Sequence, residues 1–180
     1  MNADSEQAIK GMAQISFASR KYPEAETYYG KLVVLHPDNR NYMLNKAVSQ
    51  LCCGKLEEGM AVIFRLDYEH PEDNNVRRAL AWGQLLKGDA KKAGEIYDAL
   101  IDGGRCIRAD YLNSAYAGWF CGDISSAADR LRRYVYYNNE NMGYEEFESA
   151  LAEDSTLLDS YGITATERKI MTDVVFNAGE

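Results

Sequence analysis

The side chains of this chain that could do acid–base or nucleophilic chemistry are few and lie apart. The two histidines, His36 and His70, each precede a proline, and no nucleophile or metal-ligand spacing accompanies either of them. Adjacent carboxylates such as Glu57 and Glu58 are typical of a solvated helix face. No glycine-rich phosphate loop or dinucleotide fingerprint occurs. The sequence therefore predicts a protein that is not an enzyme and binds no cofactor, with catalysis as a remote alternative.

The four cysteines follow neither a metal-binding nor a disulfide pattern. Cys52 and Cys53 are adjacent, where a disulfide is strained, and no CxxC motif occurs. Cys52, Cys53 and Cys121 fall inside apolar helical patterns, where a free cysteine behaves as a small hydrophobic residue. We therefore expect free thiols and no zinc site. The N-terminal residues lack a basic region followed by an apolar stretch, so we expect a cytoplasmic protein, or a fragment of a longer one, without a secretory signal.

The net charge of −8 is carried by the C-terminal part of the chain. Residues 140–180 contain 10 acidic and 2 basic side chains, whereas the residues before them are neutral as a block. The chain has no dense basic patch, which argues against the phosphate-neutralising surface of a nucleic-acid-binding protein. No apolar run approaches the roughly 20 residues that cross a bilayer, so no membrane span is predicted.

The elements that would position any functional residue repeat every 34 residues. One series of small residues at this interval consists of Ala13, Ala47, Ala81 and Ala115. A second series consists of Ala25, Gly59, Ala93 and Ala127, and a third of Gly54, Gly88 and Gly122. The three series share one phase and predict four units, at residues 6–39, 40–73, 74–107 and 108–141.

Each unit has the pattern of a helical hairpin. A first helical stretch ends at a break, which is a glycine in three of the units, and a second amphipathic stretch follows directly. Glycine suits the end of a helix because it adopts a positive φ without a Cβ penalty. The small residues of the first two series are expected where the two helices of a hairpin cross at close range.

The pattern resembles the tetratricopeptide repeat, a helix–turn–helix unit of the same length. The resemblance spans residues 6 to about 141 and is strongest in residues 21–29 (KYPEAETYY), followed by Pro37. It is weakest in the first helices, where the tryptophan position of the family is occupied by Ile9, Met43, Arg77 and Tyr111. The resemblance implies an all-α fold, a right-handed α–α superhelix (solenoid) of four hairpins, covering residues 1–141.

Residues 142–180 fall outside the repeat phase. Two further helices are expected there, at about Tyr144–Leu158 and Ala165–Phe176, with Thr164 and Glu167 as a capping box for the second. Together they have the size of a degenerate, acidic hairpin that caps the array. The alternative is that this acidic surface recruits a basic partner.

The first helices of such an array line its concave face, and the family resemblance implies which of their residues face a ligand. These positions are Lys10, Gln14, Phe17, Leu44, Val48, Leu51, Arg78, Trp82, Leu85, Leu112, Tyr116 and Trp119. The lining is apolar and aromatic and includes both tryptophans, which are frequent anchors of interfaces. The same residues could instead belong to the core or be covered by the C-terminal helices.

The resemblance implies a non-catalytic protein-interaction module that binds a peptide or helix of a partner, as an adaptor, a chaperone or an assembly subunit. Lys10 and Asn45 match the family's clamp for a terminal carboxylate, but Gln14, Asn75 and Ala79 depart from it. A helix or an extended apolar segment is therefore the expected ligand. The alternative is a structural, self-associating protein whose groove is filled by its own C-terminal helices, which makes a homo-oligomer possible.

Overall fold

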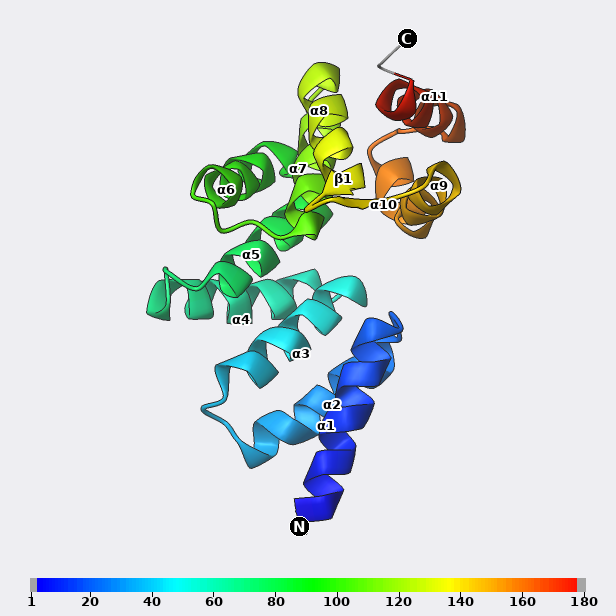
Figure 1. The fold of residues 1–180 in the computed structure, drawn as a ribbon. Coiled ribbons are helices and arrows are strands. Elements are labelled where there is room, and N and C mark those ends of the chain that lie inside the picture. The colour runs from blue at the N-terminus through cyan, green and yellow to red at the C-terminus, as the bar shows by residue number, and fades with distance from the viewer. Residues whose placement is uncertain (1–2, 178–180) are drawn as a thin grey trace. The chain divides into compact units, whose positions relative to one another are not determined.

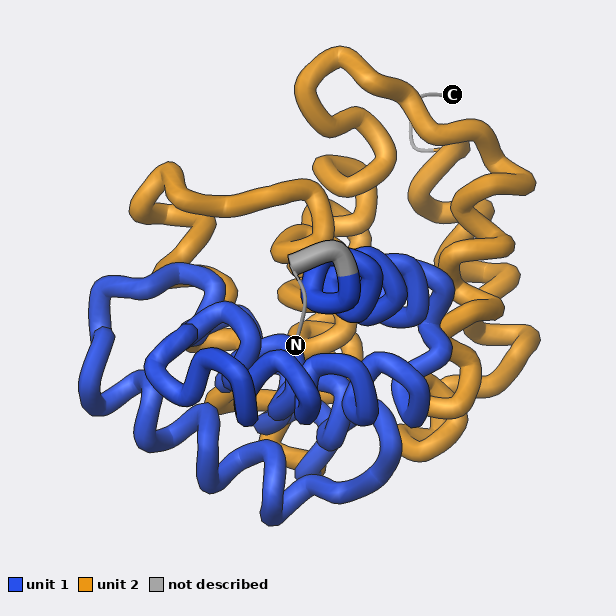
Figure 2. Tube along the Cα trace, turned by 90° about the horizontal axis from the view of Figure 1, so that it is seen from below, with its two compact units in different colours: residues 1–87 blue, residues 88–180 orange. Residues whose placement is uncertain are grey.

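The structure, a computed structural model, describes residues 3–177 and is almost entirely helical. Helices that follow one another in the chain pack as neighbours within each of two compact units, residues 1–87 and 88–180 (Figures 1 and 2). The predicted all-α helical-repeat class is confirmed. Among the described residues, no helix combines the length and the apolar character needed to cross a membrane.

The described residues of the first compact unit, 3–87, form two helical hairpins and one further helix (Figure 1). Its helices are α1 (Ala3–Ala18), α2 (Tyr22–Leu35), α3 (Arg40–Cys52), α4 (Leu56–Glu69) and α5 (Asn74–Leu86). Helix α3 packs on both α2 and α4, and α5 packs on α4 and α3. Two of the predicted units, 6–39 and 40–73, are thus the hairpins α1–α2 and α3–α4.

The described residues of the second compact unit, 88–177, form six helices and a short β-hairpin. They are α6 (Ala90–Asp102), α7 (Arg108–Phe120), α8 (Ile124–Val135), β1 (Tyr136–Tyr137), β2 (Glu140–Asn141), α9 (Tyr144–Glu153), α10 (Ser155–Ser160) and α11 (Ala165–Phe176). Helix α7 packs between α6 and α8, and α11 packs on α8 and α9. The predicted unit 108–141 is therefore the hairpin α7–α8 followed by the two strands.

Side chains of aspartate and asparagine define several helix starts. The Asn39 side chain accepts a hydrogen bond from the Tyr42 backbone N–H at 3.1 Å and caps α3. Asp73, Asp89 and Asp123 cap α5, α6 and α8 in the same way. These caps satisfy backbone donors that the first turn of a helix leaves without a partner.

The two phased series of small residues mark the close helix crossings. Ala13, Ala47, Ala81 and Ala115 are all fully buried, and so are Ala25, Ala93 and Ala127. The second series has its one glycine at the crossing of α3 and α4, where a Cβ on Gly59 would lie 2.7 Å from the Ala47 carbonyl oxygen. The sequence prediction that small residues allow these helices to approach is therefore confirmed.

The third series consists of helix-terminating glycines. Gly54, Gly88 and Gly122 have φ angles of 77°, 90° and 80°, in the left-handed region that glycine adopts without strain. The equivalent position of the first unit is occupied by Arg20, whose φ of 55° places a side chain in the same region. The turn of the first unit therefore keeps the left-handed backbone conformation although it has arginine in place of glycine.

Replacing Arg20 by glycine is expected to raise the free energy of unfolding by about 0.5 kcal/mol. The left-handed conformation costs a residue with a Cβ about 1–2 kcal/mol, and the greater freedom of glycine in the unfolded chain offsets part of this gain. Urea denaturation followed by circular dichroism measures the change. Gly54→Ala is the reciprocal control and should lower stability; a loss of stability in Arg20→Gly would show that the Arg20 side chain contributes more than the strain costs.

The C-terminal segment differs from the prediction in two details. The chain turns at Asn138 and Asn139, both with positive φ, and forms the β1–β2 hairpin, a strand pair that the helical repeat pattern does not predict. The expected helix over residues 144–158 is interrupted at Asp154, so that α9 and α10 are separate helices. The predicted capping box of α11 is confirmed, because the Glu167 N–H donates to Thr164 Oγ1 and the Thr164 N–H donates to Glu167 Oε2.

Candidate protein-interaction surface

In the first unit, aromatic packing between α1 and α2 sets the orientation of α1. The Phe17 ring lies edge-on to the rings of Tyr22 and Tyr29, with centroids 5.9 and 6.2 Å apart. Phe17 therefore contributes to the packing of the hairpin and is only partly accessible. Lys10 is also partly accessible, whereas Gln14 is exposed.

Three helices of the first unit meet at the Cys52 thiol. Cys52 ends α3, and its thiol lies near the side chains of Trp82 of α5 and Tyr22 of α2. Burial raises the pKa of Cys52, and these two polar neighbours offset part of the increase. The thiol therefore stays neutral at physiological pH and acts as a packing group. We call Tyr22, Cys52 and Trp82 the Trp82 cluster.

Two partly accessible residues lie one helical turn from members of the Trp82 cluster. Val48 lies one helical turn before Cys52, and Arg78 lies one turn before Trp82. The Arg78 guanidinium donates to Asn75 Oδ1 at 3.2 Å, which orients it along α5. Helices α3 and α5, which are in contact within one compact unit, thus carry the apolar side chain of Val48, the indole ring of Trp82 and the guanidinium of Arg78.

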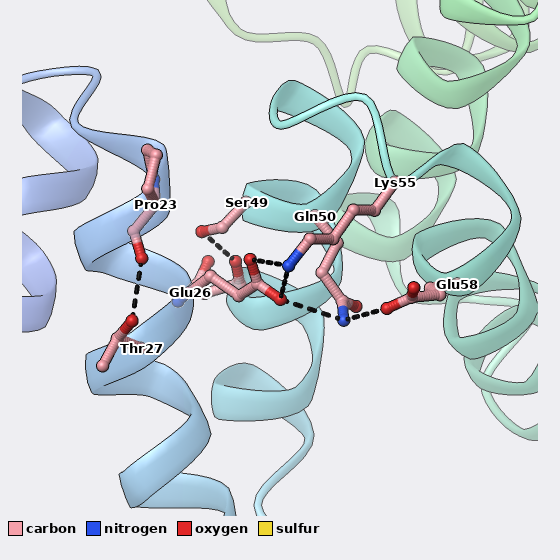
Figure 3. A network of polar contacts seen from close by, with 8 residues as sticks. Pro23, Glu26, Thr27, Ser49, Gln50, Lys55 and Glu58 are labelled. Carbon is pink, nitrogen blue, oxygen red and sulfur yellow. Dashed lines mark hydrogen bonds and ion pairs between the residues drawn. The ribbon is translucent and has the colours of Figure 1, made fainter.

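A polar network joins the first hairpin to the second (Figure 3). The Glu26 carboxylate of α2 accepts two hydrogen bonds from Lys55 Nζ, at 2.8 and 2.9 Å, and one from Gln50 Nε2 at 3.4 Å. Gln50 also donates to Glu58 at 3.3 Å. The hydrogen bond to Glu26 raises the pKa of Lys55 and keeps it charged. This network fixes the position of α2 relative to the turn that precedes α4.

In the second unit, the chain's own C-terminal residues cover the predicted concave side of α7. Tyr116 is fully buried, and its hydroxyl donates to Asp154 Oδ2 at 3.1 Å. The neighbouring Phe120 ring stacks on Tyr161, with centroids 3.7 Å apart and an interplanar angle of 6°. Since Asp154 and Tyr161 bracket α10, this short helix is held against α7.

Helices α9 and α11 cover α8 through an aromatic core. Phe147 of α9 is fully buried, with its ring centroid 6.3 Å from Tyr134 and 5.8 Å from Phe176 of α11. Arg132 of α8 donates to the Val174 carbonyl at 3.0 Å. The C-terminal segment is therefore integrated with the hairpin α7–α8.

The twelve predicted groove residues divide by burial. Those with less than a tenth of their surface accessible are Leu44, Leu51, Leu85, Leu112, Tyr116 and Trp119. Those with more accessible surface are Lys10, Gln14, Phe17, Val48, Arg78 and Trp82. All members of the second group belong to the first compact unit. Partner binding at these residues stays a prediction, and the accessible group is the place to test it.

Sequence reasoning missed Tyr22 and Cys52 as neighbours of Trp82. Tyr22 belongs to a second helix, and the apolar pattern predicts Cys52 as a core residue, so the predicted groove includes neither. The sequence contains one indication that Cys52 and Trp82 are neighbours, which is that they occupy the same side of successive first helices. Asp154 and Tyr161 were also missed, because they lie outside the repeat phase and carry no periodic signal.

No cofactor or metal chemistry is apparent at this surface. Within residues 3–177, no group of three or more histidine, cysteine, aspartate or glutamate side chains is arranged to hold a metal ion. His36 binds Glu6 at 2.8 Å and lies beside the Tyr42 ring, so it contributes to the packing between hairpins. Comparison with family models gave no match, and no similar sequence was found among curated proteins.

Proposed function

We propose that this chain is a tetratricopeptide-type repeat protein that binds a helix or an extended apolar segment of another protein and catalyses no reaction. The binding residues are the accessible first-helix residues of the first unit. The observation that carries the proposal is the Trp82 cluster, where the indole is partly accessible, Arg78 lies one helical turn before it, and Val48 occupies the equivalent position of α3. Tryptophan and arginine are the residues that most often dominate binding energy at interfaces.

The surface suits an apolar ligand with limited charge. Among the proposed binding residues, Trp82 and Val48 supply apolar area, and Arg78 and Lys10 supply positive charge. A segment with apolar side chains and a carboxylate near one end would match this arrangement. The predicted binding mode is thus a helix or strand held by side-chain packing, without recognition of a free chain terminus.

Site-specific photo-crosslinking of the full chain tests this function. A photoreactive residue at Gln14, which is exposed on the predicted groove side, is expected to give an adduct with a discrete partner protein. The same residue at Lys31, exposed on α2, serves as the control and should give no such adduct. Equal labelling of the partner from both positions would contradict the proposal.

With the partner purified, Trp82→Ala is expected to weaken binding by about tenfold or more, since hot-spot aromatic residues contribute about 2 kcal/mol or more. Tyr68→Ala is the matched control, because Tyr68 is an aromatic residue of α4 that is 89% exposed. Titration calorimetry measures both affinities. Circular dichroism must show that Trp82→Ala remains folded, and Val48→Asp provides an independent variant if it does not.

A second candidate function is a structural role in which the chain covers its own groove. The observation in its favour is the contact of Tyr116 with Asp154 and of Phe120 with Tyr161 in the second unit. Such a protein would self-associate through its other faces. Sedimentation at several concentrations separates the two functions, because a concentration-independent monomer contradicts this second candidate.

A further inference from the structure

One side of α1 is uncharged, largely apolar and exposed. Ala8, Met12 and Ile15 lie on one side of α1, and Ser19, directly after its last residue, continues the same spacing of three and four residues. We call these four residues the α1 outer face. All four are exposed, with 46% of Met12 and 64% of Ile15 accessible. The opposite side of α1, which includes Ala13, is buried against α2.

The residues equivalent to Ile15 in the later first helices are buried. At steps of 34 residues, Ile15 corresponds to Ser49, Gly83 and Ala117, of which Ser49 is fully buried and Ala117 is 1% exposed. A Cβ on Gly83 would collide with the Met60 sulfur of α4. This position of α5 is thus in direct contact with the second helix of the preceding hairpin.

The positions equivalent to Met12 and Ala8 show the same relationship. Ser114, equivalent to Met12, donates from Oγ to Asp98 Oδ1 of α6 at 2.9 Å. Tyr42, equivalent to Ala8, has its ring centroid 6.5 Å from that of Tyr29 in α2. In α3, α5 and α7, therefore, the side that corresponds to the α1 outer face packs on the preceding second helix.

We propose that the α1 outer face binds one amphipathic helix of a partner protein, in the position that the second helix of a preceding hairpin would occupy. The contact would continue the series of interfaces α2–α3, α4–α5 and α6–α7 by one step. None of the four residues is charged, so the partner helix must present small and apolar residues, and salt should affect the binding little. This surface is separate from the Trp82 cluster.

A second copy of the chain is a poorer occupant than a different protein. Among the helices that the structure describes, the equivalent sides of α2, α4 and α6 are covered by α3, α5 and α7. The corresponding side of α8 is covered by α11, where Arg132 donates to the Val174 carbonyl. Another copy therefore has no second helix available for this contact. A dimer through this face would instead have to pair the two α1 helices with each other.

The experiment supplies a helix of known sequence to this face. A copy of residues 40–73 is joined directly to residue 6, which keeps the 34-residue phase and places a copy of α4 beside α1. The fusion is expected to unfold in one transition, with a melting temperature about 5 °C or more above that of the unmodified chain. Hydrogen exchange of the α1 amides should slow by about tenfold or more.

Ile15→Asp is expected to abolish both effects in the fusion and to change the melting temperature of the unmodified chain by only about 1 °C, because the residue is exposed there. Gln14→Asp is the matched control, since Gln14 is exposed on another side of the same helix, and it should preserve both effects. Trp82→Ala should also preserve them, which separates this proposal from the proposed function. A fusion with two unfolding transitions and unchanged α1 exchange would overturn the docking site.

The identity of the occupant is tested by crosslinking from Met12. A photoreactive residue there is expected to give an adduct with another protein, and the fused hairpin should eliminate that adduct by occupying the face. The assignment to a partner helix would be overturned if no adduct formed, or if the adduct formed equally well in the fusion. A dimer of the unmodified chain that Ile15→Asp dissociates in sedimentation would also overturn it, because α1 would then pair with a second copy.

Discussion

Gly59→Ala is expected to lower the free energy of unfolding by about 1–3 kcal/mol, although the substitution normally stabilises a helix interior. The new Cβ would lie 2.7 Å from the Ala47 carbonyl oxygen and 2.8 Å from a methyl carbon of Leu51. The first of these atoms belongs to the backbone of α3 and cannot rotate away. The helices α3 and α4 must therefore separate, and the packing of the whole hairpin weakens.

Two other helical glycines are matched controls for this prediction. A Cβ on Gly30 would meet nothing closer than a Lys46 side-chain carbon at 4.0 Å, and one on Gly11 would have no atom within 4 Å. Gly30→Ala and Gly11→Ala are expected to raise stability by about 0.5–1 kcal/mol. Urea denaturation of the three variants measures the contrast. Stability of Gly59→Ala at or above the wild-type value would show that the two helices are not held at close range.

The second large effect is expected at the aromatic core of the C-terminal segment. Phe147→Ala should cost about 3–5 kcal/mol, because the side chain is fully buried between the rings of Tyr134 and Phe176. The cavity would remove the contact that joins α9 to both α8 and α11. We therefore expect α9, α10 and α11 to detach from the hairpin α7–α8 at a lower denaturant concentration than in the wild type.

Limited proteolysis with a glutamate-specific protease measures this detachment, because α9 contains Glu145, Glu146, Glu148 and Glu153. Cleavage within α9 should be faster in Phe147→Ala than in the wild type. Tyr68→Ala, at an aromatic residue of α4 that is 89% exposed, is the control and should leave the rate unchanged. A destabilised Phe147→Ala variant with wild-type cleavage in α9 would show that the C-terminal helices do not depend on this core for their attachment.

Much of the fold could be predicted because its determinants are local or periodic. The buried alanines at Ala13, Ala47, Ala81 and Ala115 and the left-handed glycines at the hairpin turns are read directly from a 34-residue spacing. The capping box of Thr164 and Glu167 needs only residues three positions apart. Each of these features depends on the geometry of one helix or one hairpin, which the nearby sequence determines.

The interaction surface could be predicted only in part. The repeat phase places Trp82 and Tyr116 at the same position of successive units, yet Trp82 is partly accessible and Tyr116 is fully buried. The difference arises from Asp154 and Tyr161, which hold α10 against α7 and follow no period. Similarly, Ile15 and Ser49 are equivalent in phase, but only Ser49 has a second helix packed on it.

By itself, the sequence determined the helical hairpins, their 34-residue repeat and the small residues at their crossings, because backbone sterics and helix periodicity act over short distances. Only the tertiary structure decided which first-helix faces are covered, since burial depends on contacts between residues far apart in the chain. The covered side of α7 and the exposed side of α1 both follow from such contacts. The exposed side of α1 and the accessible first-helix residues near Trp82 are therefore the surfaces on which binding should be tested.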